Sequence, residues 1–380
     1  MGLYFNPNNK KIIKDISSSI YVDKTGLIEK LNKILCTNDN CVAVSHALRF
    51  GKSQAANLIE AYYSMGCDSK DIFSKFEIAQ ADDFEKHLNK YHVIHIDVSS
   101  FSDCYGKDIV ESIIQALIDD IRDSFPDVGY DEPFHRVLSD IYMESGRQFV
   151  IIIDEWDYII RDYSDQPELV TKYMRFLHSI FKGMEARRFL ALGYVTGILP
   201  IKILNDESGP NNFRGRTMMD SKNIARYYGF TEEEVKVLCE KYDMLFDEIK
   251  NWYGGYQING YHMYNPYSVC QAMMEHSLRP YWASTTVPET IDKYVALGFE
   301  GLRDDITKIL AGEEVNVHTG TFRNDLNDIN SRDEALTALI HLGYLGFRKI
   351  SDNYGVVYIP NDEVRQAFLS TSISKPCCKH

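Results

Sequence analysis

The segment that most constrains the fold is 148–153 (QFVIII), which carries no charged residue and is followed at once by Asp154. Six residues are the length of a strand, and a strand that is apolar on both faces must be covered on both faces. Further strands are predicted at 41–45, 91–98 and 188–196, and helices at 52–65, 106–123 and 167–184. Alternation of such strands with helices predicts an α/β fold, with a parallel sheet sandwiched by helices.

The pattern changes after about residue 205, where a polar loop at 206–217 leads into a mainly helical stretch. Thr231 with Glu234 has the spacing of a capping box, and Asn265 before Pro266 is a typical helix start. A last unit is predicted as a helix at 332–342, two strands at 345–350 and 355–359, and a short helix from 361. Helix, hairpin and helix in this order indicate a winged-helix-like unit.

A phosphate-binding motif follows the first predicted strand. Gly51, Lys52 and Ser53 stand between that strand and a helix, where backbone N–H groups and the helix dipole favour an anion. In a P-loop, the lysine reaches the β- and γ-phosphates and the serine holds Mg²⁺. The full pattern is G-x-x-x-x-G-K-[ST], and His46 stands at its first glycine, so the match is incomplete. The predicted nucleotide-binding residues are Arg49, Phe50, Gly51, Lys52 and Ser53, although Arg49 has packing of the loop as an equal alternative.

Two carboxylates end the apolar strand. In P-loop enzymes an aspartate at this place holds Mg²⁺, so we predict Asp154 as a metal ligand together with Ser53. Glu155 is predicted as the catalytic residue that orients and activates the attacking water, with Lys52 and Thr196 as further catalytic residues. Thr196 ends the fourth strand, where its hydroxyl can sense the γ-phosphate; a plain strand-end threonine is the alternative. Asp97 and Ser99 end another strand at the same edge and are further candidates for ligand binding, but a helix cap is the favoured interpretation of these two residues.

With these motifs, the sequence resembles the AAA-ATPase-like family, whose members often continue into a PD-(D/E)XK nuclease-like domain. The matching segments, in order, are 22–25 (VDKT), 49–53 (RFGKS), 153–157 (IDEWD), 196–198 (TGI), 211–213 (NNF), 228–231 (YGFT), 252–256 (WYGGY), 264–268 (YNPYS), 343–345 (GYL) and 359–364 (IPNDEV). The resemblance implies a P-loop ATPase core with ATP and Mg²⁺ as ligands. The resulting division is an ATPase core at 1–205, a helical domain at 206–330, a winged-helix-like unit at 331–370 and a tail at 371–380.

Two departures from the family pattern affect the expected activity. Family members usually carry Arg-Pro-Arg-Arg before Phe-Gly-Lys, whereas His46, Ala47 and Leu48 precede Arg49 here. Fewer basic residues weaken the attraction for phosphate, so a nucleotide-gated protein-interaction module with little hydrolysis is the alternative to an ATPase. The chain also ends at His380, and we therefore expect no nuclease activity from it.

The composition of the chain limits the classes of partner that we expect it to bind. With 41 basic and 55 acidic residues the net charge is −14, which disfavours nucleic acid as a partner, although a winged-helix regulator remains a third alternative. No stretch reaches the roughly 20 apolar residues of a membrane span. The eight cysteines include no CxxC pair, which is typical of a reduced, cytoplasmic protein. We therefore expect ATP and a protein as partners and no membrane.

Overall fold

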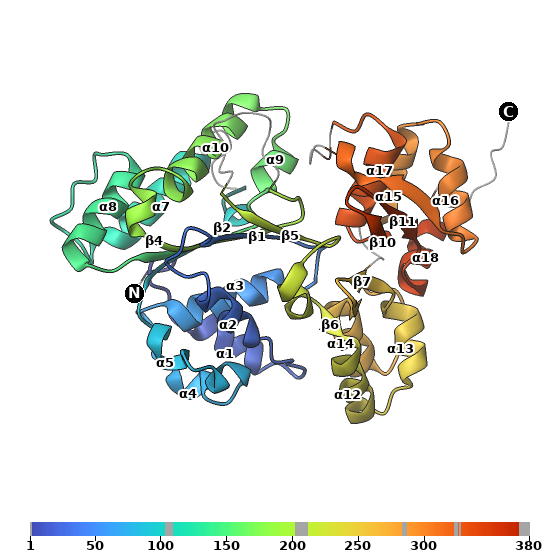
Figure 1. Cartoon of the computed structure of the whole chain (residues 1–380), viewed down its shortest axis with the longest axis horizontal. Helices are drawn as coiled ribbons and strands as arrows, with labels where there is room; N and C mark the ends of the chain where they lie inside the picture. The colour runs from blue at the N-terminus through green and yellow to red at the C-terminus, as the bar shows by residue number, and fades with distance from the viewer. Residues whose placement is uncertain are drawn as a thin grey trace. The chain divides into compact units, whose positions relative to one another are not determined.

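The computed structural model (Figure 1) describes residues 2–102, 109–201, 212–282, 287–322, 326 and 328–371. The chain divides into two compact units. The first contains residues 1–45 and 52–216, and the second contains residues 46–51 and 217–380. The predicted division into three domains and a tail stays a prediction, and the tail lies almost wholly outside the described residues.

A five-stranded sheet forms the centre of the first unit, with the strand order β2-β3-β4-β1-β5. Its strands are β1 (Cys41–Ser45), β2 (His92–Asp97), β3 (Phe149–Asp154), β4 (Leu190–Gly197) and β5 (Arg214–Thr217). The pairs β2–β3, β3–β4 and β1–β4 are all parallel, and every residue of β1, β3 and β4 is buried. The predicted α/β fold with a helix-covered parallel sheet is therefore confirmed.

Helices cover both faces of this sheet (Figure 1). On one face lie α7 (Ile109–Arg122), α8 (Phe134–Ser145) and α10 (Pro167–Phe181), and on the other lie α1 (Lys10–Ile16), α2 (Gly26–Asn32) and α3 (Lys52–Tyr63). The remaining α-helices in the described part of this unit are short: α4 (Lys70–Phe73), α5 (Phe84–His87), α9 (Tyr158–Asp162) and α11 (Ala186–Phe189). The main core is formed by β1 to β4 with α7, α8 and α10. Of these helices, α8 is absent from the sequence prediction.

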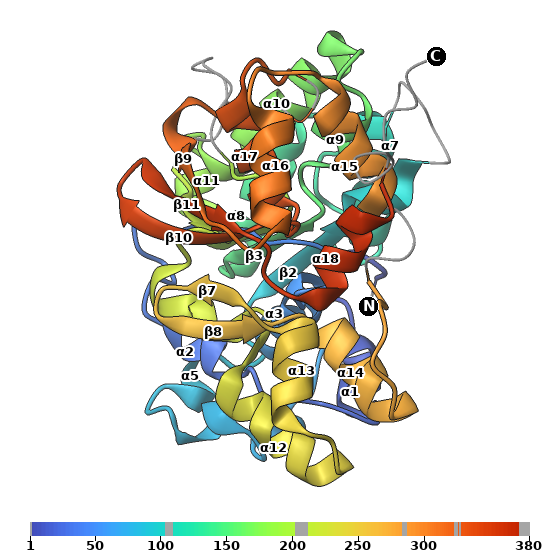
Figure 2. The ribbon, with the colours of Figure 1, turned by 90° about the vertical axis from the view of Figure 1, so that its right-hand side faces the viewer.

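The second unit contains two small sheets of three strands each. The first has the order β6-β8-β7, built from β6 (Phe230–Thr231), β7 (Tyr256–Ile258) and β8 (Tyr261–Tyr264). Its helices, α12 (Glu232–Tyr242), α13 (Phe246–Tyr253) and α14 (Pro266–Glu275), are visible beside it in Figure 2. Both predicted caps are confirmed, since Thr231 and Glu234 form a complete capping box and the Asn265 side chain accepts from the N–H of Tyr267.

The second small sheet has the order β10-β11-β9. The predicted helix, hairpin and helix are present as α17 (Arg332–His341), β10 (Gly346–Ser351), β11 (Tyr354–Tyr358) and α18 (Asp362–Leu369). The structure adds β9 (Val315–His318), which pairs with β11, and the helices α15 (Val287–Ala296) and α16 (Leu302–Leu310). The winged-helix-like character of this region stays a prediction.

Within the described ranges, no helix is both long enough and apolar enough to cross a bilayer. The cysteines at 36, 41, 67, 239 and 270 carry free thiols. The cytoplasmic location stays a prediction.

Candidate functional site

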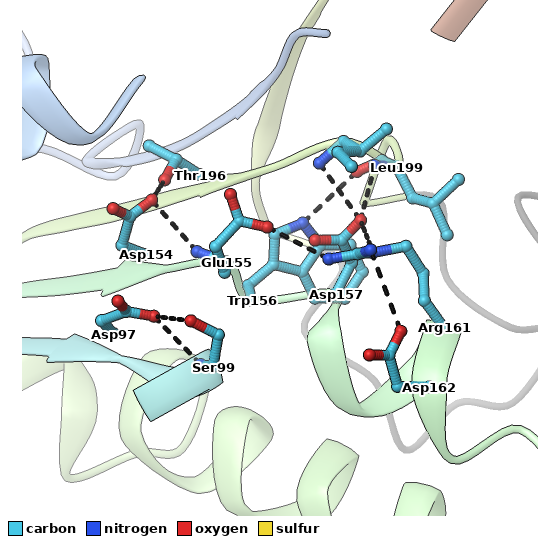
Figure 3. A network of polar contacts seen from close by, with 11 residues as sticks. Asp97, Ser99, Asp154, Glu155, Trp156, Asp157, Arg161, Asp162, Thr196 and Leu199 are labelled. Atoms are coloured by element: carbon cyan, nitrogen blue, oxygen red, sulfur yellow. Dashed lines mark hydrogen bonds and ion pairs between the residues drawn. The ribbon is translucent and has the colours of Figure 1, made fainter. Parts of the chain in front are cut away.

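The carboxyl ends of three neighbouring strands bring polar residues into one row in the first unit. The sheet register pairs Asp97 of β2 with Asp154 of β3, and Ile153 of β3 with Val195 of β4. Asp154 therefore ends β3 beside Thr196, as Figure 3 shows. Ligands of open α/β sheets bind outside such strand ends, so this edge is the candidate site.

Asp154 and Thr196, predicted from separate motifs, contact each other directly. The Thr196 hydroxyl donates a hydrogen bond to Asp154 Oδ1, which also accepts the N–H of Glu155 at 3.1 Å. Asp154 is only 4% exposed and Thr196 is fully buried. A buried carboxylate needs hydrogen-bond donors to remain stable. The Thr196 hydroxyl supplies one, and this bond also fixes the direction of the carboxylate.

Glu155 leaves the strand in an unusual backbone conformation. Its φ of +50° lies in the left-handed region, which costs a non-glycine residue roughly 1–3 kcal/mol and is found mainly where surrounding contacts enforce it. The next residue supplies such contacts, since Trp156 donates its N–H to the carbonyl of Thr196 at 2.9 Å and its indole N–H to the carbonyl of Leu199 at 3.3 Å. The turn after β3 is thereby attached to the end of β4.

The environment of Glu155 favours its protonated form. Burial is the main cause and raises the pKa of Glu155 to about 7, with Asp157 and Asp154 acting in the same direction. The positive charges of Lys52 and Arg161 act against this rise. A carboxyl whose pKa lies near neutral pH can both accept and release a proton there, which suits a general base.

Asp157 and Arg161 complete the site, and sequence reasoning assigned no role to either. Asp157 Oδ2 accepts the N–H groups of Ile198 at 3.1 Å and Leu199 at 2.8 Å, and the Arg161 Nε at 3.1 Å. Arg161 Nη2 also lies 3.1 Å from Glu155 Oε2 (Figure 3). A four-residue spacing of Asp and Arg on a helix was the one available signal, because such pairs lie on the same helix face.

Lys52 and Ser53 occupy the first turn of α3, directly after the loop that follows β1. The Lys52 side chain belongs to the buried residues, at 4% exposed, although lysine is among the residues least often buried. Its positive charge opposes the rise in the pKa of Glu155. Ser53 is exposed. β1 ends beside β4, with Ser45 paired to Gly197, so α3 begins at the same edge of the sheet as Asp154 and Thr196.

The loop 46–51 groups with the second unit, although it lies between β1 and α3 in the sequence. His46 Nε2 lies 2.6 Å from Ser221 Oγ, and the His46 ring lies 5.1 Å from that of Tyr228. Gly51 has a φ of +84°, and Arg49 has a φ of +65°. Turns with left-handed residues can direct successive N–H groups into a concave anion site, so the backbone of this loop remains suited to phosphate.

The side chains of Arg49 and Phe50 pack within the second unit. The Arg49 guanidinium lies 3.8 Å above the centre of the Tyr267 ring. Phe50 is fully buried, packs edge-on against Tyr256, and accepts the N–H of Gly229 at its carbonyl with a distance of 2.9 Å. Arg49 was predicted either to contact phosphate or to pack the loop, and its contact with Tyr267 favours packing. Because the Phe50 side chain is buried, only the backbone groups of Phe50 are available to a ligand.

Asp97 and Ser99 form a local cap at the end of β2. Asp97 Oδ1 accepts the N–H of Ser99 at 3.0 Å and its hydroxyl at 2.7 Å. The helix-cap interpretation of these two residues is the one that the contacts favour.

The donor set agrees with a magnesium nucleotide. Among the described residues, no group of three or more His, Cys, Asp or Glu side chains could hold a metal by itself. Mg²⁺ is usually bound through one or two carboxylates together with substrate phosphates and water, so a lone carboxylate such as Asp154 suits Mg²⁺. The ammonium of Lys52, close to this strand end, suits the phosphates.

Comparisons with known proteins agree with the sequence motifs. The model of a family described as "Predicted AAA-ATPase" matches residues 8–205. A protein of Azotobacter chroococcum mcd 1, described as an uncharacterized protein in the vnfD 5′ region, is 30% identical over 161 residues. That alignment covers 41% of this chain and 30% of the relative's length.

Solved structures also resemble the chain, at low similarity. Cdc6p from Pyrobaculum aerophilum is 12% identical, with a TM-score of 0.35, and the alignment covers 94% of this chain and 96% of that one. The ORC2 protein of Aeropyrum pernix, solved as ADPNP–ADP complexes, is 12% identical with a TM-score of 0.35, covering 96% and 97% of the two chains.

Proposed function

The chain belongs to the predicted AAA-ATPase family, and on this premise we propose that it binds Mg-ATP at the carboxyl end of its parallel sheet and hydrolyses it. The observation that carries the proposal is the meeting of predicted residues at one edge. The charge of Lys52 lowers the pKa of Glu155, and the Thr196 hydroxyl donates a hydrogen bond to Asp154, although these residues come from three separate segments.

Phosphate binding would use the start of α3 and the loop before it. The N–H groups of Arg49, Phe50 and Gly51 and the N-terminus of the helix would bind phosphate oxygens, and Lys52 would neutralise their charge. Burial of Lys52 supports this role, since a charged ammonium of low exposure gains from a nearby anion.

Ser53 and Asp154 are the residues that would hold Mg²⁺, which would neutralise charge on the phosphates. Thr196 keeps Asp154 in one orientation through its hydrogen bond. Glu155 would accept a proton from the attacking water, because its pKa of about 7 lies close to neutral pH.

The proposal is tested by calorimetric titration with ATP, with and without Mg²⁺, and by phosphate release from the purified chain. We expect Lys52→Ala to lose nucleotide affinity. We expect Glu155→Gln to keep the affinity and to lose turnover by about 10²-fold or more, the usual contribution of a general base.

Two substitutions serve as matched controls. Lys70 is also the first residue of a helix, and Glu144 is an exposed glutamate on α8. Lys70→Ala and Glu144→Gln should leave binding and turnover unchanged. Equal phosphate release from wild type, Lys52→Ala and Glu155→Gln would contradict hydrolysis, and absence of heat with both ATP and ADP would contradict nucleotide binding altogether.

A second function is favoured by the side chains of the loop 46–51. His46 and Phe50 contact Ser221, Tyr228 and Tyr256, so a ligand on the loop backbone acts on a segment that packs within the second unit. We therefore propose as the alternative a nucleotide-gated module that binds a protein partner and turns ATP over slowly or not at all.

Hydrogen exchange separates the two functions. A gated module should show slower amide exchange at 217–264 when ATP is added to wild type, and no change in Lys52→Ala. Residues of α16 in the same unit serve as the internal reference. Turnover without any change at 217–264 would support the ATPase and contradict the gated module.

The contacts of the predicted winged-helix-like unit do not favour nucleic acid. Arg348 forms an ion pair with Glu314, and Lys349 lies 3.1 Å from Asp352. Each basic side chain near the hairpin therefore already has an acidic partner, and we do not propose a DNA-binding regulator.

A further inference from the structure

Arg161 lies between two carboxylates of different surroundings. Its Nη2 is 3.1 Å from Glu155 Oε2, and its Nε is 3.1 Å from Asp157 Oδ2. The Arg161 side chain is 18% exposed, that of Glu155 is 20% exposed, and that of Asp157 is fully buried. A planar guanidinium can bind two acceptors at once in fixed directions, which an ammonium cannot do equally well.

The Asp157 carboxylate is held in place by several hydrogen bonds. Its Oδ2 receives two backbone N–H groups from Ile198 and Leu199, directly after β4, in addition to Arg161. Hydrogen bonds to an ionised acceptor are roughly twice as strong as neutral ones. Asp157 is therefore held by the main chain, and Arg161 is held by Asp157.

Glu155, by contrast, depends on Arg161 for its orientation. The left-handed backbone at Glu155 turns its side chain toward α9, where Arg161 is the residue that binds Oε2 (Figure 3). The Asp154 carboxylate, one residue earlier, is directed to Thr196 instead. Two adjacent carboxylates thus point to different partners.

We propose that Arg161 is a positioning residue, which keeps the Glu155 carboxylate in one orientation through an ion pair anchored on Asp157. It need not contact a nucleotide. The proposal deepens the proposed function, because it states how the general base of that site is oriented, and its ATPase test rests on that function.

The first test needs no nucleotide. Thermal unfolding is measured for wild type, Glu155→Gln, Arg161→Ala and the double variant. We expect Arg161→Ala to lower the unfolding midpoint more when Glu155 is present than in the Glu155→Gln background, because only the former retains the carboxylate that Arg161 binds.

An equal loss in both backgrounds would overturn the proposal, since it would assign Arg161 a purely structural role through Asp157. Arg161→Lys replaces Arg161→Ala if the latter does not fold, because it keeps the positive charge. With lysine, the same comparison should give a smaller dependence on background.

The second test measures ATP turnover. Arg161→Ala should lower kcat at least about tenfold and leave KM for ATP within about twofold, and Arg161→Lys should recover part of the rate. Arg136→Ala is the matched control, since Arg136 binds Glu132 four residues earlier but is exposed. An unchanged kcat in Arg161→Ala would overturn the proposal.

The two tests keep this proposal separate from the proposed function. A wild-type chain without turnover would contradict hydrolysis, while the unfolding comparison would still decide whether Arg161 controls Glu155. Turnover in wild type with additive unfolding effects would support the function and reject the role of Arg161.

Discussion

Asp157 Oδ2 lies 2.8 Å from the amide nitrogen of Leu199, so a side chain after β3 holds the main chain that follows β4. The same oxygen binds Ile198 and Arg161. This carboxylate adds to the contacts of Thr196 and Trp156 that connect the ends of β3 and β4.

Replacement of Asp157 should destabilise the first unit strongly. Asp157→Asn removes the negative charge that pairs with Arg161 and should lower the free energy of unfolding by about 3–5 kcal/mol, the usual cost of breaking a buried ion pair. Asp162→Asn is the control, because Asp162 is 44% exposed at its side chain and lies 3.9 Å from the same arginine. Urea unfolding measures both, and equal effects would contradict a special role for Asp157.

Gly197 should tolerate no side chain. A Cβ at this position would come within 2.4 Å of Asp157 Oδ1 and 2.7 Å of Trp156 Cδ1. Gly197→Ala should therefore cost about 1–3 kcal/mol of unfolding free energy, as overpacking does. Gly215→Ala on β5 is the matched control, since nothing lies within 4 Å of its added carbon. A Gly197→Ala chain as stable as Gly215→Ala would show that Asp157 can move aside.

Ionisation of Glu155 should make stability depend on pH. Its pKa is raised from 4.5 to about 7, so its contribution to stability is fully present below pH 4.5 and is lost as the pH rises through 7. Glu155→Gln removes this loss. The variant should gain stability over wild type between pH 5 and pH 8, by up to about 3 kcal/mol. Urea titrations at both pH values, with Glu144→Gln as the control, measure the gain, and a constant difference would contradict the raised pKa.

Phe50 should stabilise the second unit although it belongs to a phosphate-binding motif. It packs with Tyr256, Met263 and Met218 in a buried cluster. Phe50→Ala should lower the local free energy of unfolding by about 3–5 kcal/mol through loss of buried surface and the remaining cavity. Hydrogen exchange at 256–264 measures this loss. Leu48→Ala in the same loop is the control, because Leu48 is already 36% exposed, and a similar effect of both substitutions would contradict the specific role of Phe50.

The strands and the long helices of the first unit were predictable because their signal is local. The four strands β1 to β4 each carry their own apolar run, and β1 has the predicted bounds 41–45. The prediction of a polar loop over 206–217 was wrong at its end, because Arg214–Thr217 pairs into the sheet as β5 although the strand has no apolar run. The helix α8 was missed, although its apolar residues Phe134, Val137, Leu138 and Ile141 are buried at helical spacing. The short strand β9 was also missed, since four residues give too little periodicity to identify a strand.

The sequence by itself determined the alternation of β1 to β4 with the helices α3, α7 and α10, and the positions of Lys52, Asp154, Glu155 and Thr196 at strand ends and a helix start. Hydrophobic periodicity and short motifs are properties of neighbouring residues, so they can be read without coordinates. Only the tertiary structure decided that Arg161 binds Glu155, and that the loop 46–51 directs Phe50 into the second unit. Such contacts depend on which surfaces meet when the chain folds, and no spacing along the sequence encodes that meeting.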